Sequence, residues 1–536
     1  MTEMLKTSET TEKLLKFIDA SPSCFHAVKN ICVMLEDAGC IRLLENETWT
    51  LEKGKRYFTT RNGSSVLAFS VPENYNGMQI VSAHSDSPTF RVKSGAEITV
   101  EGHYKKLNTE GYGGMILSTW FDRPLSLAGR AVVRTESGVK SVLLNIDRDL
   151  CIIPSLAIHM TRGMADHKLN PQVDLLPLLG GENADYNALI AEEAGVKKED
   201  VISSDMFLYP RQHGVVFGME NEFIASPRLD DLQCAFSATE AFLNAENKEK
   251  LLISAVFDNE EVGSLTKQGA DSTFLTDTVR RIASALNIPE AEWLRKMPDS
   301  FMLSADNAHA VHPNYTEKCD QTNRCYLNGG IVIKYSANQK YTTDSVSAAV
   351  FGEICRKAEV PVMIFQLGFL TPLFYVLSDL VGSGVRPTVS GVLRRVFTNP
   401  MVIAAVLGVV GLEDHGGLQG HRGGGDLKSG DLGGGARGHG AVCVCGGGVV
   451  GGGRQAVDDL EVEGEAQALG VAQRGGQQPG GAGLRVGAAG LGPPSRRRDG
   501  GVADRMHGRC AHVAMVARPR MRRTRGKEVA CPGTIS

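Results

Sequence analysis

The sequence FDNEEVG at Phe257–Gly263 follows the apolar run Leu251–Val256, which has the pattern of a buried β-strand. In α/β sheets, ligands bind beyond the carboxyl ends of the strands. Because the chain turns there, Glu260 and Glu261 can both reach one site. One carboxylate can bind a metal while the other takes a proton from a metal-bound water. An isolated pair of glutamates also fits a solvated acidic turn, so the interpretation depends on other motifs.

A second motif with the same placement begins at His84. The run Met78–Ala83 predicts another strand, and it ends in His84-Ser85-Asp86. A histidine at a strand end can bind a metal while a neighbouring carboxylate orients its ring. Asp86 lies close enough in sequence for that supporting role. Taken alone, the motif is weak evidence and fits a structural or surface histidine better than a metal ligand.

Three further carboxylates lie at a helix start or directly after a predicted strand. Asp230 and Asp231 open a predicted helix, where the helix dipole alone would favour acids, and Asp306 follows the predicted strand Phe301–Ala305. Mixed histidine and carboxylate ligands favour zinc, manganese or cobalt over calcium. His84, Asp230, Glu261 and Asp306 with a spare glutamate exceed what one catalytic zinc needs. The pattern therefore indicates a two-metal site.

The order of the predicted elements indicates an α/β fold with an insertion. Apolar strands alternate with amphipathic helices in residues 1–89 and 225–366, whereas residues 90–224 carry short strands among glycines and aromatics. We expect helices over 10–20, 23–36, 273–286 and 343–357, a strand pair around the turn at 61–63, and strands at 78–83, 251–256, 301–305 and 331–335. Residues 90–224 are expected to form a β-rich inserted domain.

The composition and the N-terminal residues argue against a nucleic-acid-binding, membrane-binding or exported protein. The net charge of −4 and the pI of about 6.4 give the whole chain no attraction to nucleic acid or anionic membranes. The N-terminal residues lack the basic and apolar regions of a signal peptide. The 12 cysteines form no C-x-x-C pair, so reduced thiols and a cytoplasmic location are expected.

The motifs together resemble the M18 family of metalloaminopeptidases, which includes the aspartyl aminopeptidases. The resemblance covers about residues 11–366. It is carried, in order, by VSAHSDSP (81–88), EGYGGMILSTWFDRPLSLAGR (110–130), IPSLAIHM (153–160), SPRLDDL (226–232), FDNEEVGS (257–264), SADNAHAVHPNY (304–315) and KYSANQKY (334–341).

The resemblance implies a role for each site residue. His84 and Asp306 would hold one of two divalent metal ions, zinc in the first place, with manganese or cobalt as alternatives. Asp230 would bridge both ions and Glu261 would bind the second. Glu260 would be the general base and Asp86 would support His84. Three more residues would contact substrate: His159, reaching into a neighbouring subunit, Lys334 and Tyr341.

The resemblance also implies an architecture and a reaction. A mixed-sheet metallopeptidase domain would carry an inserted β-rich dimerisation domain, and dimers would build a homo-oligomeric dodecamer. The substrate would be a peptide with an N-terminal residue, often acidic, that is removed. A metal-bridging hydroxide would attack the scissile carbonyl while Glu260 shuttles the proton.

The family pattern stops near Gln366, and composition changes at the same place. Residues 1–366 contain 22 glycines and residues 367–536 contain 39. Residues 367–410 form an apolar segment that loosely resembles pieces of an auxin-efflux-type transporter. Its apolar runs are shorter than the ~20 residues that a membrane-spanning helix needs, so no membrane partner is expected. Residues 411–536 form a Gly/Arg-rich low-complexity tail, expected to be irregular or disordered.

This C-terminal part leaves several interpretations open. It fits a basic nucleic-acid tail, a disordered extension, or translation from a shifted reading frame or a fused gene. In each case the metal-binding histidine that the family carries after this point is replaced by foreign sequence. Two hypotheses follow for the chain: a dinuclear aminopeptidase impaired at the metal of Glu261, or an inactive oligomeric scaffold of the same family.

Overall fold

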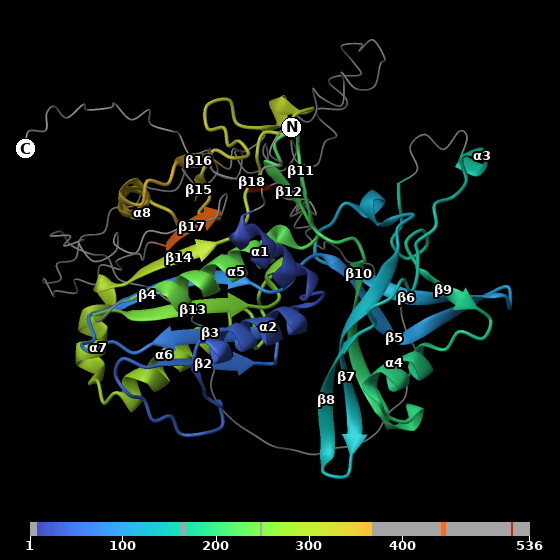
Figure 1. The fold of residues 1–536 in the computed structure, drawn as a ribbon, viewed down its shortest axis with the longest axis horizontal. Coiled ribbons are helices and arrows are strands. Elements are labelled where there is room, and N and C mark those ends of the chain that lie inside the picture. The colour runs from blue at the N-terminus through green and yellow to red at the C-terminus, as the bar shows by residue number, and fades with distance from the viewer. Residues whose placement is uncertain (1–7, 162–167, 247–248, 367–440, 446–515, 518–536) are drawn as a thin grey trace, which may run out of the picture. The chain divides into compact units, whose positions relative to one another are not determined.

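The structure is a computed structural model that describes residues 8–161, 168–246, 249–366, 441–445 and 516–517. The residues it describes form a first large sheet with a hydrophobic core on each face, a second large sheet with a core of its own, and a small third sheet. Figure 1 shows the α/β part and the β-rich part as distinct groups of elements. The mixed α/β architecture expected from the sequence is confirmed.

The first sheet is mixed and is centred on the glutamate-bearing strand. Its order is β1-β2-β3-β13-β4-β14-β17-β15-β16. The bounds are β1 Ile41–Arg42, β2 Arg56–Arg61, β3 Ser65–Ser70, β4 Met78–His84, β13 Leu251–Phe257, β14 Phe301–Ala305, β15 Ile331–Tyr335, β16 Val362–Gln366 and β17 Ala441–Cys445. Strands β13, β4, β14 and β17 run parallel. Their carboxyl ends therefore lie at one edge of the sheet.

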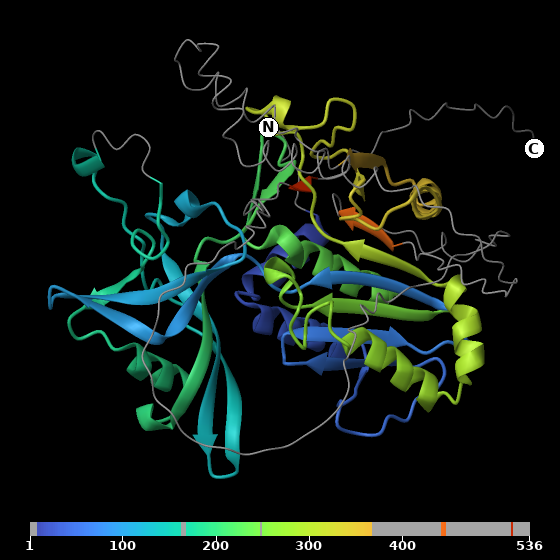
Figure 2. The ribbon, with the colours of Figure 1, turned by 180° about the vertical axis from the view of Figure 1, so that it is seen from behind.

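Helices cover both faces of this sheet because its central strands are apolar on both sides. All seven residues of β13 are buried, as expected for a strand between two helical layers. One core joins the sheet to α1 Glu9–Asp19, α2 Cys24–Asp37 and α5 Leu229–Asn244. The opposite core joins it to α6 Phe274–Ala285 and α7 Glu290–Lys296. Figures 1 and 2 show these two helical layers from opposite sides. Near β15, α8 Ser345–Lys357 contributes a smaller cluster.

The insertion is an antiparallel sheet of order β8-β7-β10-β5-β6-β9. Its strands are β5 Thr89–Val100, β6 Tyr104–Tyr112, β7 Leu125–Thr135, β8 Gly138–Asn145, β9 Leu178–Gly181 and β10 Val201–Pro210. It also carries α3 Ile158–Thr161 and α4 Tyr186–Ala194, and α4 packs on β7, β8 and β10. The expected division at 90 and 224 stays a prediction, although β5 begins beside the first of these positions.

Two short strands of the C-terminal part join the described sheets. β17 pairs with β14 in parallel and with β15 antiparallel, so it lies inside the first sheet. The third sheet consists of β11 Val215–Phe217, β12 Phe223–Ala225 and β18 Val516–Ala517. The apolar segment 367–410 and the rest of the predicted tail lie outside the described residues. No helix in the described part of the chain is long and apolar enough to cross a membrane.

Candidate metal centre

The four predicted ligands come from elements that meet at the carboxyl edge of the first sheet. His84 is the last residue of β4 and pairs in register with Phe257, the last residue of β13. Asp306 directly follows β14, and Asp230 lies in the first turn of α5. Glu261 belongs to the short 3₁₀ turn Glu260–Val262 beyond β13. Parallel strand direction therefore gathers residues that are far apart in sequence.

The side chains of these residues converge on two overlapping groups. One contains His84, Asp230, Asp231 and Asp306, and the other contains His84, Glu260 and Glu261, with one ligand atom per residue within 4.8 Å of the others. His84 Nε2 lies 3.5 Å from Asp230 Oδ1 and 3.9 Å from Glu260 Oε2. His84 is therefore common to both groups.

The donor set fits a divalent cation. Among the described residues, the buried oxygens Asp230 Oδ1, Asp231 Oδ1 and Glu261 Oε2 have no hydrogen-bond partner. Several buried carboxylates held together without compensating charge are costly, and a cation would supply that charge. One imidazole with several carboxylates is a ligand set that zinc, manganese and cobalt accept.

Asp86 holds the histidine and the glutamate turn together. The ring atom His84 Nδ1 lies 3.0 Å from the main-chain oxygen of Asp86 and 3.3 Å from its Oδ1. The main-chain N–H groups of Glu260 and Glu261 donate to the two carboxylate oxygens of Asp86 at 3.1 and 3.2 Å. With Nδ1 engaged, Nε2 faces the cluster, which is the arrangement that a supporting carboxylate gives a ligand.

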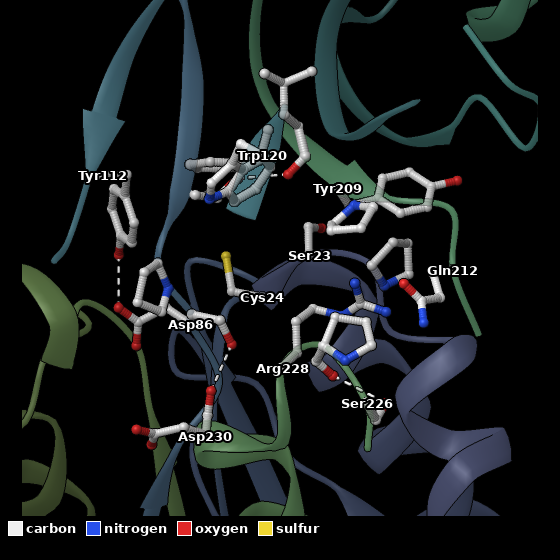
Figure 3. Close-up of a pocket in the computed structure, with 18 of the residues that line it drawn as sticks. Ser23, Cys24, Asp86, Tyr112, Trp120, Tyr209, Gln212, Ser226, Arg228 and Asp230 are labelled. Carbon is white, nitrogen blue, oxygen red and sulfur yellow. Dashed lines mark hydrogen bonds between the residues drawn. The ribbon is translucent and has the colours of Figure 1, made fainter. Parts of the chain in front are cut away.

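The inserted domain reaches this network through Tyr112. Its hydroxyl donates to Asp86 Oδ2 at 2.8 Å (Figure 3) and accepts the side-chain amide of Asn259 at 2.8 Å. Next to it, Gly113 has a φ of +74°, and a Cβ there would lie 3.0 Å from the Cβ of Glu261. The glycine in the EGYGG motif thus allows β6 to approach the glutamate turn closely.

The turn itself depends on two left-handed residues. Asn259 has a φ of 64° and Gly263 a φ of 104°, and both residue types tolerate this region. The Asn259 side-chain oxygen accepts from Thr266 Oγ1 at 2.6 Å and from Gln268 Nε2 at 2.7 Å. The sequence Asp-Asn-Glu-Glu-Val-Gly therefore folds as a tight loop with its glutamates displayed toward the cluster.

The pKa values differ between members of the cluster. Burial, with the negative charges of Asp230, Asp86 and Glu260, raises the pKa of Glu261 to about 8, although His84 acts in the opposite sense. Burial likewise raises the pKa of Asp231. Asp306 differs: burial raises its pKa, but the charges of Lys334 and His84 together with hydrogen bonds with Lys334 and Asp230 outweigh burial, so the pKa is lowered. Without a bound cation, the Glu261 carboxyl is thus protonated more readily than that of Asp306.

The three predicted substrate residues lie in different surroundings. Lys334 is buried, and its ammonium donates to Asp306 Oδ2 and to the main-chain oxygen of Asn307, both at 2.8 Å. It lies 5.4 Å from the centre of the Tyr341 ring. His159 is exposed on α3 of the inserted domain and does not belong to the cluster. The roles of all predicted site residues stay predictions.

Sequence reasoning missed three members of the site. It named Asp231 only as an acid at a helix start, but its side chain is fully buried and its Oδ2 accepts the main-chain N–H of His84 at 3.0 Å. Tyr112 and Asn259 were given no role. The doubled aspartate in SPRLDDL was a usable signal, because one of two adjacent carboxylates at a helix start can turn inward.

Comparison with known proteins agrees with the geometry. A family model described as "Aminopeptidase I zinc metalloprotease (M18)" matches residues 17–372. The "Probable M18 family aminopeptidase 2" of Clostridium acetobutylicum is 47% identical over 369 residues, covering 67% of this chain and 85% of that protein.

Solved structures with related sequences also align with this chain. The structure of Chaetomium thermophilum mApe1 aligns with a TM-score of 0.62 and 30% identity, covering 69% of this chain and 88% of that one. The S. cerevisiae mApe1 dodecamer aligns with a TM-score of 0.59 and 27% identity, covering 70% and 88%. The family match ends close to Gln366, where the motif pattern also stops.

Proposed function

The chain belongs to the aminopeptidase I zinc metalloprotease (M18) family, and on that premise we propose that it hydrolyses the first peptide bond of peptides with an acidic N-terminal residue. The observation that carries the proposal is the cluster of His84 with five carboxylates at one sheet edge, three of whose buried oxygens lack a partner. A site of this composition suits metal-assisted hydrolysis.

We propose that the residues divide between two divalent ions, zinc in the first place. His84 and Asp306 would hold one ion, Glu261 the other, and Asp230 would contact both. When bound, such ions polarise the scissile carbonyl and make a water more acidic. Asp86 keeps the His84 ring and the glutamate turn in position through the contacts described above.

Glu260 is the proposed general base. Its main-chain N–H is fixed by Asp86, and its Oε2 lies 3.9 Å from His84 Nε2, beside the cluster. The carboxylate takes a proton from the attacking water as the new C–O bond forms. It then gives that proton to the amine nitrogen as the C–N bond breaks. A carboxylate at this distance from the ligand atoms is within reach of both the attacking water and the amine nitrogen of the leaving group.

The preference for acidic residues is proposed from Lys334 and Tyr341. The Lys334 ammonium is a buried positive charge beside Asp306, and it would attract a substrate carboxylate. Its present contact with Asp306 means that it would hold that ligand and face the substrate at the same time.

A homo-oligomer is proposed from the exposed tip that carries His159. Its neighbours Ile158 and Met160 are 70% and 68% exposed, which is unusual for a pair of large apolar side chains on one short helix. A second copy of the chain would cover them and bring His159 to a neighbouring site. The S. cerevisiae relative described above forms a dodecamer. The eight cysteines between residues 24 and 355 are free, which supports a reducing compartment such as the cytoplasm.

An inactive scaffold is the second candidate, because the described part of the cluster contains His84 as its one histidine. The test is hydrolysis of matched peptides with N-terminal aspartate or lysine, with zinc, manganese or cobalt added. We expect slow, metal-dependent release of aspartate, well below the rate of a family member with its C-terminal histidine. Absence of metal-dependent release from either peptide would favour the scaffold.

A further inference from the structure

A cavity of about 210 Å³ lies where α2, the end of β10 and the segment before α5 meet. We call it the junction pocket. Trp120, Phe207 and Tyr209 of the inserted domain and Cys24, Pro227 and Arg228 of the α/β part are among its lining residues (Figure 3). Its volume is well above the ~10–15 Å³ that one water needs, so it has room for an organic molecule.

The junction pocket is distinct from the metal cluster, although the two share a wall. Ser87 Oγ donates to the main-chain oxygen of Asp230 at 2.9 Å, and both residues line the pocket. Figure 3 shows the Asp230 carboxylate pointing away from the pocket. A molecule in the pocket would therefore contact the back of the segments that carry Asp86 and Asp230.

Arg228 gives this apolar pocket a positive charge with donors to spare. Its Nη2 donates to the main-chain oxygen of Ile18 at 3.1 Å, but its buried Nε and Nη1 have no hydrogen-bond partner in the described structure. Arg123 also lines the pocket, and its buried Nε likewise has no partner there. Buried N–H groups without acceptors are rare in folded proteins and call for a ligand, ion or water.

The carboxylates around Arg228 do not neutralise it. Asp19, at the end of α1, is close enough to attract the guanidinium, yet its side chain accepts from His213 Nδ1 at 3.2 Å and from the Gly214 N–H at 3.4 Å. No ion pair joins Arg228 to any described carboxylate. Burial lowers the pKa of Arg228 to about 10, which leaves it charged at neutral pH.

We propose that the junction pocket is a binding site for a small molecule with one carboxylate and an apolar body. The carboxylate would accept the free N–H groups of Arg228, and the body would pack against Trp120, Phe207 and Tyr209. This proposal does not depend on the peptidase activity, because the positive charge and the aromatic side chains that it uses are not among the candidate metal ligands, although Asp86 and Asp230 also line the pocket.

Isothermal titration of the full-length chain with phenylacetate tests the proposal, with phenylacetamide as the neutral control of the same shape. We expect phenylacetate to bind at least about tenfold more tightly, since a charge-assisted hydrogen bond to a buried group is worth about 1.5–3 kcal/mol. Free phenylalanine, with the same ring and carboxylate, tells whether an amino acid of the kind that an aminopeptidase releases can also be the ligand.

Two variants locate the site. Arg228→Met removes the charge at similar length and should weaken phenylacetate at least about tenfold while leaving phenylacetamide unchanged. Thr119→Trp blocks the pocket from an exposed position, so it should fold normally and weaken both compounds. Equal binding of phenylacetate and phenylacetamide, no binding of phenylacetate at about 10 mM, or unchanged binding by Thr119→Trp would each overturn the proposal.

Discussion

The two halves of the metal cluster are not equally complete. In the Asp306 half, formed by His84 and Asp306, the Asp306 carboxylate is paired with Lys334 at 2.8 Å and its pKa is lowered. In the Glu261 half, formed by Glu260 and Glu261, the Glu261 Oε2 is buried without a hydrogen-bond partner, and the pKa of this carboxyl is raised to about 8. Asp230 belongs to the same group of candidate ligands as Asp306.

The difference between the halves indicates that the Glu261 half lacks ligands for a cation. A carboxylate with a lowered pKa is ionised and ready to bind a cation, whereas one with a raised pKa must first lose its proton. His84 is the one histidine in the described part of the cluster. It is common to both groups, but in the proposed assignment it binds the ion of Asp306. The Glu261 half therefore depends on a cation that has few other ligands, and we expect it to bind metal more weakly.

Replacing His84 by alanine should have the largest effect, because its Nε2 belongs to both groups. We expect zinc affinity to fall more than ~100-fold, since even residues that only support a ligand are worth about 10–100-fold. Zinc per chain after exhaustive dialysis measures this. His312→Ala is the matched control, as His312 is exposed and outside the cluster. Normal zinc retention by His84→Ala would rule out a shared ligand.

Replacing Glu260 by glutamine should separate catalysis from metal binding. The amide cannot accept a proton, so we expect the residual kcat at saturating zinc to fall about 10²–10⁴-fold. Zinc content should stay near that of the unaltered chain. Steady-state hydrolysis of an aspartyl peptide measures the rate, and a Glu260→Gln chain with full turnover would remove this residue from the mechanism.

The raised pKa of Glu261 predicts that the stability of the metal-free chain depends on pH through the Glu261 half of the cluster. The ordinary value for this carboxyl is 4.5 and the folded value is about 8, so between these pH values the folded metal-free chain binds more protons than the unfolded chain. Its stability should therefore fall as pH rises from 4.5 to 8. Thermal unfolding across this range measures the slope, and Glu261→Gln should reduce it. An unchanged slope in the variant would assign the effect to other groups.

The same titration predicts how zinc binding changes. Zinc affinity of the Glu261 half should rise up to about tenfold per pH unit below pH 8, because the cation displaces a proton. The Asp306 half should change little over that range. Titrations with zinc in buffers of different ionisation enthalpy would detect the released proton. Equal pH dependence of both zinc sites would contradict the contrast between the halves.

Tyr112→Phe should give the smallest effect. It removes the O–H that donates to Asp86 Oδ2 at 2.8 Å, a bond worth about 1.5–3 kcal/mol when the acceptor is charged. We expect zinc affinity to fall about tenfold. Tyr186→Phe is the matched control, because Tyr186 is a buried tyrosine of the inserted domain whose hydroxyl contacts Ser204 at 3.0 Å. Equal zinc loss in both variants would indicate a general loss of stability.

The sequence predicted the strands that carry the site because their apolar runs are continuous and end in polar residues. The strands expected at 301–305 and 331–335 have those bounds in the structure. The helix expected at 23–36 begins at Cys24 and ends at Asp37, and the Ser23 side chain contacts His26 Nδ1 at 2.8 Å rather than capping the helix. The spacing of apolar residues predicts helices and strands well, because burial on one or both faces of an element dictates that spacing.

The contacts within the site could not be predicted in the same way. Asp231 turns inward onto the His84 N–H, and Tyr112 reaches Asp86 from a different sheet. Both contacts depend on how elements distant in sequence pack together, which no local pattern encodes. The place of β17 between β14 and β15 is a third example. Its residues lie in a glycine-rich region without hydrophobic periodicity.

The stoichiometry and affinity of zinc on the full-length chain test the central contrast most directly. Titration of the metal-free chain at pH 7 should reveal one tight site, assigned to the Asp306 half by its loss in Asp306→Asn, and a second site at least about tenfold weaker. Two sites of equal, tight affinity would contradict this account, because they would require the Glu261 half to be as complete as its neighbour.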